Sequence, residues 1–205
     1  MAHHRRTIGA ATLLNTAISV GEGCVAFYSG SLSVLVDSVH NLSDELTLAC
    51  LYLAFFLPGY LGRQSQRTAN LFNSAGLVAI SGALVWEAIE RLRQPVSVSA
   101  SVPVITGLAA AGANWGVAFL LREPARHNAA VRLAYVHNLG DVGVSLAPVA
   151  AGLMITFNGR PMFDPLVGLG VGLWLVVSTV RALLTSSGGD LLWPEEMSCG
   201  QPKEA

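Results

Sequence analysis

The sequence predicts an all-α, polytopic membrane protein with six transmembrane helices, and three observations support this fold class. Hydrophobic residues make up 52% of the 205 residues, and the mean hydropathy is +0.53. Only 12% of the residues are charged, about half of the roughly 25% found in a typical soluble domain. Six apolar stretches each reach the length of about 20 residues that a helix needs to cross a bilayer.

The six stretches are expected to be helices joined by short connections rich in glycine, proline, serine and asparagine. A helix satisfies its backbone hydrogen bonds internally, as a bilayer requires. Strands of a membrane β-barrel would alternate over about ten residues, whereas these runs are longer and continuous. The expected spans are 8–28, 32–57, 71–91, 98–121, 130–157 and 165–185.

The spans are expected to form one membrane domain, residues 8–185, between two short ends. Residues 1–7 are expected to be a cytoplasmic N-terminus. Residues 186–205 are expected to be a short cytoplasmic tail, because about twenty polar residues cannot bury a core. With the termini inside, all but three of the 12 lysines and arginines lie on the cytoplasmic side, as the positive-inside rule requires. The exceptions are Arg91, Arg93 and Arg160.

Charge and cysteine content exclude several classes of protein. The net charge of −1 gives no basic surface for nucleic acid. Cys24, Cys50 and Cys199 are far apart, so they form neither a disulfide framework nor a thiolate zinc site. A soluble enzyme, a nucleic-acid binder and a disulfide-rich secreted module are therefore excluded.

A repeated polar motif lies within the second and fifth spans. Residues 39–44 read VHNLSD and residues 136–141 read VHNLGD, which places His40 four residues before Asp44 and His137 four residues before Asp141. This spacing puts both side chains on one helical face. If the two faces meet, they present two imidazoles and two carboxylates, which are donor types that zinc accepts in tetrahedral sites. Ionisable residues inside spans are rare and usually functional.

The positions of the two motifs suggest a repeat in the membrane domain. Three spans in each half would make the second and fifth helices antiparallel. A motif repeated on antiparallel helices is typical of a 3+3 inverted repeat, whose site lies near the bilayer midplane.

Other polar residues within the expected spans have two interpretations each. Asp37 is expected to line the exit path or support the metal ligands, and Glu22 to lie on a proton path. A structural hydrogen bond is the alternative for both. Glu87 and Arg91 are expected to form an ion pair at a helix end. Asp164 precedes Pro165, which is typical of an N-cap with proline in the first turn.

The motifs resemble those of the cation diffusion facilitator family over the whole membrane part. Residues 30–44 are similar to the second span of that family, and His137–Asp141 to the fifth-span motif. Further similarities are Glu87–Leu92 with Pro95, Asn114, and Phe163–Pro165. The sequence is identified as a zinc-type member, and as a short form without the C-terminal cytoplasmic domain that is usual in this family.

The resemblance implies a homodimeric secondary active transporter and not an enzyme. It would export divalent cations, zinc before Cd²⁺, Co²⁺ or Ni²⁺, from the cytoplasm by alternating access in exchange for protons. Zinc and protons would be substrate and counter-ion at His40, Asp44, His137 and Asp141. Because metal binding requires neutral imidazole and ionised carboxylate, it releases protons. The expected location is the bilayer of a prokaryotic inner membrane.

Three departures from the family pattern stand beside this resemblance. The C-terminal domain is missing, the expected loop 58–70 is short and lacks acidic ligands, and the next cytoplasmic loop has one histidine, His127. Two other functions stay open: a membrane metal sensor that does not transport, and a membrane-embedded metalloenzyme. An enzyme would keep an open coordination position for water.

Overall fold

The computed structural model describes the backbone of residues 2–54, 59–126 and 129–185, and the side chains of residues 9–46, 74–126, 131–132, 134–181 and 183–184. Over this part of the chain all regular secondary structure is helical, which confirms the predicted all-α class. Its elements are α1 (Ala2–Ser29), α2 (Leu32–Ala54), α3 (Gly59–Arg93), α4 (Ser101–Leu121), the short 3-10 helix η1 (Pro124–Arg126), α5 (Ala129–Asn158) and α6 (Phe163–Thr185).

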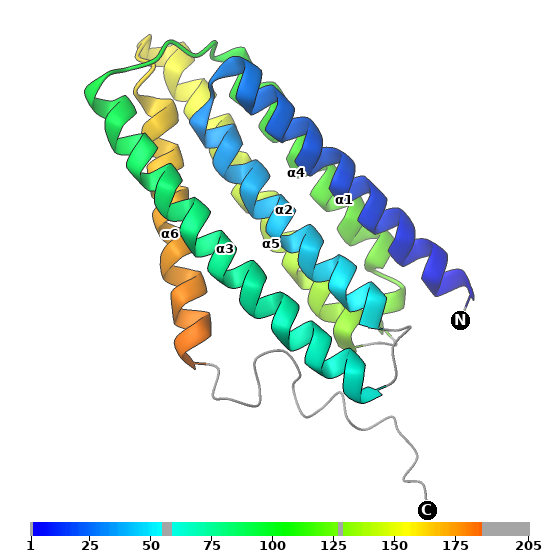
Figure 1. Ribbon diagram of the computed structural model, residues 1–205. Coiled ribbons are helices and arrows are strands. Elements are labelled where there is room, and N and C mark those ends of the chain that lie inside the picture. Colours follow the sequence, from blue (N-terminus) through cyan, green and yellow to red (C-terminus); the bar gives the residue numbers. More distant parts are fainter. Residues whose placement is uncertain (1, 55–58, 127–128, 186–205) are drawn as a thin grey trace, which may run out of the picture.

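The helices form one elongated antiparallel bundle in which α2 is central (Figure 1). Helix α2 contacts each of the other five α-helices. On one side of it, α1 packs on α4 and α4 packs on α5; on the other side, α3 and α6 pack on each other. Because α2 and α5 also contact each other, side chains between them are shielded by neighbours on both sides.

Helices α4 and α5 approach each other closely at two glycines. A Cβ atom on Gly152 would lie 2.5 Å from the Ala100 carbonyl oxygen, and one on Gly107 would lie 2.7 Å from the Ser145 carbonyl oxygen. Only hydrogen fits at these two positions, because real Cβ atoms do not approach so closely. This contact lets the Asn114 side chain of α4 reach the Ser145 hydroxyl of α5 at 3.1 Å.

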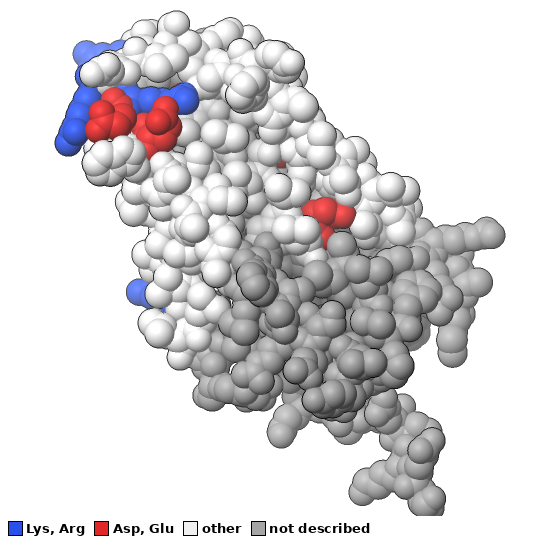
Figure 2. All heavy atoms as spheres, in the orientation of Figure 1, with Lys and Arg blue, Asp and Glu red and all other residues white. Residues whose placement is uncertain are grey.

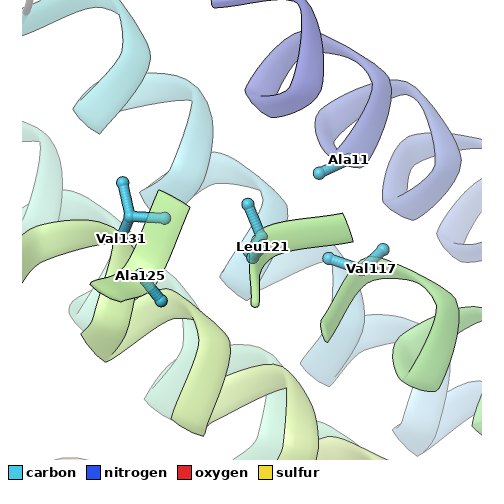
Figure 3. Close-up of a cluster of buried hydrophobic side chains, with 5 residues drawn as sticks. All are labelled: Ala11, Val117, Leu121, Ala125 and Val131. Carbon is cyan, nitrogen blue, oxygen red and sulfur yellow. The ribbon is translucent and has the colours of Figure 1, made fainter. Parts of the chain in front are cut away.

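A small apolar cluster joins the end of α4 to its neighbours (Figure 3). Val117 and Leu121 of α4 meet Ala11 of α1, Ala125 of η1 and Val131 of α5. These side chains are all buried. Between helices in a bilayer the gain comes from close packing, because lipid tails are as apolar as leucine.

Four of the helices carry segments long and apolar enough to cross a membrane within the described residues: Gly9–Ser29, Ser101–Leu121, Ala134–Asn158 and Phe163–Arg181. Large apolar side chains such as Phe27, Tyr28 and Phe157 are exposed on the bundle surface, as expected of residues that face lipid. On the face drawn in Figure 2, charged side chains gather at one end, and most of the remaining described surface is uncharged. The protein is therefore an integral membrane protein, while six spans and an inverted repeat stay predictions.

Two expectations from the sequence are wrong, one about where α3 begins and one about the helix that Asp164 caps. The connection expected at residues 58–70 is largely helical, because α3 begins at Gly59 instead of near residue 71. This stretch contains two arginines and two glutamines, which are polar but good helix formers, so the helix continues through it. The predicted tail at 186–205 and His127 lie outside the described residues.

Asp164 does not cap its own helix. Helix α6 begins at Phe163, so Asp164 already lies in its first turn. Its carboxylate instead accepts bonds from the start of α2: from the Leu32 backbone N–H at 2.6 Å and the Ser31 hydroxyl at 2.7 Å. The carboxylate thus satisfies the unpaired donors of a different helix.

Candidate metal site

The two repeated motifs meet between α2 and α5 and form an alternating cycle of histidine and aspartate. His40 Nδ1 lies 3.4 Å from Asp44 Oδ2, and His40 Nε2 lies 3.2 Å from Asp141 Oδ1. His137 Nε2 lies 2.8 Å from Asp44 Oδ1 and 3.8 Å from Asp141 Oδ2. Each carboxylate therefore contacts both imidazoles, and residues 97 positions apart in the two motifs converge at one place.

Three of these residues are the tightest group. Ligand atoms of His40, Asp44 and Asp141 all lie within 4.8 Å of one another. His40 and Asp141 are buried, at 5% and 4% exposed. Such a group of one nitrogen and two carboxylate oxygens can hold a divalent cation.

Buried polar atoms without a hydrogen bond add a second reason to place a cation here. His40 Nδ1 and Asp44 Oδ2 are both shielded from solvent and have no hydrogen-bond partner within the described part of the chain, although they lie 3.4 Å apart. Buried polar atoms normally have partners, and exceptions call for an explanation such as a bound ion. Two adjacent ligand atoms left this way fit coordination of a shared metal.

His137 lies at the edge of the site. Its side chain is 47% exposed, compared with 6% for the side chains of His40 and Asp141. The two imidazole centroids are 6.3 Å apart, with their planes at 70°. His137 therefore reaches the cluster through Asp44 while it remains accessible from outside. Metal binding by the four residues stays a prediction.

Trp174 of α6 forms a wall of the site that the sequence did not indicate. Its ring packs edge-on against His40, with centroids 6.2 Å apart and planes at 79°. A single tryptophan in an apolar span carries no local signal. Its position depends on α6 packing against α2.

A ring of buried polar side chains from four helices lies beside the site. The Asn41 amide donates to Glu22 Oε2 at 2.7 Å, and the Asn114 amide donates to Asn41 Oδ1 at 3.3 Å. Asn114 also donates to the Ser145 hydroxyl at 3.1 Å, and that hydroxyl donates to Asp37 Oδ1 at 3.3 Å. All five side chains are at most 2% exposed. The structural hydrogen bonds foreseen as the alternative for Glu22 and Asp37 are present, and Asn41 links helices.

The contact between Ser145 and Asp37 could have been predicted from the sequence. Ser145 follows Asp141 by four residues, and Asp37 precedes His40 by three. On antiparallel helices both positions lie one turn further in the same direction along the bundle. The contact of Asn114 with Ser145 could not be predicted in this way, because it depends on the close packing of α4 and α5.

Glu87, Arg91 and Glu45 make contacts that support the helices. Arg91 Nε lies 2.8 Å from Glu87 Oε1, which confirms the predicted ion pair at the end of α3. The Arg91 guanidinium also donates to the Gly30 carbonyl in the turn between α1 and α2. On α2, Glu45 accepts a hydrogen bond from Thr16 of α1 at 2.7 Å.

Comparison with known proteins agrees with a membrane-spanning fold. Residues 63–192, more than half of the chain, match the cation efflux transmembrane domain. The zinc transporter ZitB of Escherichia coli is 33% identical over 177 residues, which are 81% of this chain and 56% of that protein. The cadmium, cobalt and zinc/H(+)-K(+) antiporter of Bacillus subtilis is 28% identical over 178 residues, covering 81% of this chain and 57% of that protein.

A more distant relative is the proton-coupled zinc antiporter SLC30A8 of Xenopus tropicalis, 24% identical over 186 residues, which are 77% of this chain and 50% of that protein. The chain thus spans about half the length of the curated relatives that it matches. These relatives are named transporters and antiporters, not enzymes. With the match to the transmembrane domain, this shows that the chain belongs to the cation diffusion facilitator family of cation efflux proteins.

Proposed function

We propose that the chain exports zinc from the cytoplasm in exchange for protons, with His40, Asp44, His137 and Asp141 holding the metal in transit. The observation that carries this proposal is the cycle in which each carboxylate contacts both imidazoles. It lies in a protein whose relatives are named zinc transporters and antiporters. Cd²⁺, Co²⁺ and Ni²⁺ are further candidate substrates, because they accept the same nitrogen and oxygen ligands.

The same four groups serve protons and metal in turn. Histidine donates to a carboxylate when it is protonated, whereas it binds a metal through a neutral nitrogen. Histidine changes charge between about pH 5 and pH 8. Zinc that enters the cycle therefore displaces protons, and protons that enter from the more acidic side displace zinc.

Alternating access requires that the site open to one side at a time. We propose that α2 and α3 also span the membrane, which gives six spans with a 3+3 inverted repeat. The polar residues Asp37, His40 and Asp44 lower the hydropathy of α2, and such residues belong at an intramembrane pathway. Residues 8–185 would then be the transport domain of a homodimer, with both termini in the cytoplasm and the domain in a prokaryotic inner membrane.

Transport in proteoliposomes tests this function. An imposed proton gradient should drive zinc across the vesicle membrane, as reported by an entrapped zinc indicator. His40→Ala and Asp141→Ala should each reduce the initial rate by more than about 100-fold, because each removes a proposed ligand. Loss of a residue that only hydrogen-bonds to a ligand already lowers metal affinity or activity by about 10–100-fold. Glu123→Ala, which changes an exposed acid on the α4–α5 connection, is the control and should transport normally. Zinc binding without flux in the unaltered protein would identify a sensor instead.

A further inference from the structure

We propose that Glu22 and Asp37 form a carboxyl pair that binds one proton inside the bundle and releases it when the metal site fills. This inference rests on the proposed function and adds a second proton-binding place beside the metal ligands. The pair joins α1 to α2 and belongs to the polar ring described above.

The pair is short of hydrogen-bond donors. Glu22 receives one donor, the Asn41 amide at 2.7 Å on Oε2, and Asp37 receives one, the Ser145 hydroxyl at 3.3 Å on Oδ1. The second oxygens, Glu22 Oε1 and Asp37 Oδ2, are buried, and no side chain or backbone group among the described residues donates to them. The two carboxyl groups lie close enough to hydrogen-bond to each other. Ionised carboxylates only accept, so this bond exists only when one of them carries a proton.

The charges around the pair also favour one proton bound between Glu22 and Asp37. The titratable groups that act on the pair include His40 on α2 and Asp141 on α5. Both carboxyl groups are at most 2% exposed. Two like charges in one buried site are strongly unfavourable, and a shared proton removes one of them.

The pair is near enough to sense the metal. His40 follows Asp37 by three residues, a rise of about 4.5 Å along the helix. A divalent cation at His40 and Asp141 attracts negative charge through a medium of low dielectric constant. This favours the pair with both carboxylates ionised. The O–H bond then breaks, its electrons stay on oxygen, and the proton passes to water, so one positive charge leaves as two enter.

The release of protons on zinc binding tests the pair. The purified full chain in detergent is titrated with Zn²⁺ in weak buffer that contains a pH dye. Glu22→Gln keeps the shape, and its amide can donate permanently to Asp37, so it should release about one proton fewer per zinc than the unaltered protein. Asp37→Asn should show the same deficit. Glu45→Gln, a buried acid of α2 outside the ring, should release the full number. Equal release by Glu22→Gln and the unaltered protein would overturn the inference.

Infrared spectroscopy tests the pair without zinc, so that failure of the inference and failure of the proposed function are distinct. The metal-free protein should show the carbonyl stretch of a protonated carboxyl group, and Glu22→Gln should remove that band. If the unaltered protein lacks the band at neutral pH, the pair holds no proton and the inference is wrong, whatever the protein transports.

Discussion

The carboxylate of Asp164, near the start of α6, caps the N-terminus of α2 from across the bundle. Its Oδ2 accepts the Leu32 N–H at 2.6 Å, and its Oδ1 accepts the Ser33 hydroxyl at 2.5 Å. The first N–H groups of a helix have no partner within the helix, and here a residue 132 positions away supplies it. Helix α2 carries His40 and Asp44, so this contact fixes one end of the helix that presents half of the proposed metal site.

Asp164→Ala should destabilise the protein by at least about 2 kcal/mol, because it removes an ionised acceptor and leaves buried donors unpaired. The measurement is the unfolding midpoint in detergent. Glu90→Ala is the control, since Glu90 forms an exposed pair with Arg93 at 3.0 Å, and such pairs contribute about 0–1 kcal/mol. Equal shifts in the two variants would show that the cap between helices has no special weight.

Gly152→Ala should destabilise the protein by about 1–3 kcal/mol, the usual cost of overpacking. The added Cβ would lie 2.5 Å from the Ala100 carbonyl oxygen and 3.0 Å from Pro103, which forces α4 away from α5. Gly170→Ala is the matched control in α6, because nothing lies within 4 Å of its added Cβ, and alanine favours a helix by about 1 kcal/mol. The two changes should therefore shift the unfolding midpoint in opposite directions. A stable Gly152→Ala protein would contradict the close contact.

Asp44→Ala should weaken zinc binding by more than about 100-fold, because it removes a proposed ligand. Loss of a residue that only hydrogen-bonds to a ligand weakens metal affinity by about 10–100-fold. Asp44 lies 3.4 Å from His40 of its own helix and 2.8 Å from His137 of α5. Calorimetric titration measures the change. Glu45→Gln, at the adjacent position, keeps the same helix and should bind zinc within a few-fold of the unaltered protein. Similar losses in both variants would point to a damaged helix and not to a lost ligand.

Zinc affinity should fall as the pH falls. Protons compete with zinc for two imidazoles and two carboxylates, so the metal binds best where the histidines are already neutral. Between about pH 8 and pH 5 the affinity should drop by roughly tenfold to 100-fold per pH unit once histidine protonation sets in. His40→Ala should show a shallower slope because one competing proton is gone. An affinity independent of pH over this range would argue against these ligands.

Much of the helical content could be predicted from the sequence, because the spans are long and apolar. Convergence of the two motifs could also be predicted, since spacing of four residues places histidine and aspartate on one face. The beginning of α3 could not, because polar residues mark the end of an apolar run but not the end of a helix. A local pattern also misassigned Asp164, whose neighbour Pro165 suggested a cap for the wrong helix.

The residues around the metal site depend on which helices are neighbours, and the sequence does not state this. Trp174 reaches His40 because α6 packs against α2. Asn114 joins the polar ring because glycines let α4 approach α5. Such contacts are set by tertiary packing, whereas the paired motifs are already visible within single helices.

X-ray absorption at the zinc edge of the zinc-loaded protein tests the central claim most directly. We expect four ligands, two imidazole nitrogens at about 2.0–2.1 Å and two carboxylate oxygens at about 2.0–2.2 Å. In the His40→Ala and His137→Ala double variant the imidazole contribution should disappear. Sulfur at about 2.3 Å, or an imidazole contribution that survives in the double variant, would contradict the proposed site.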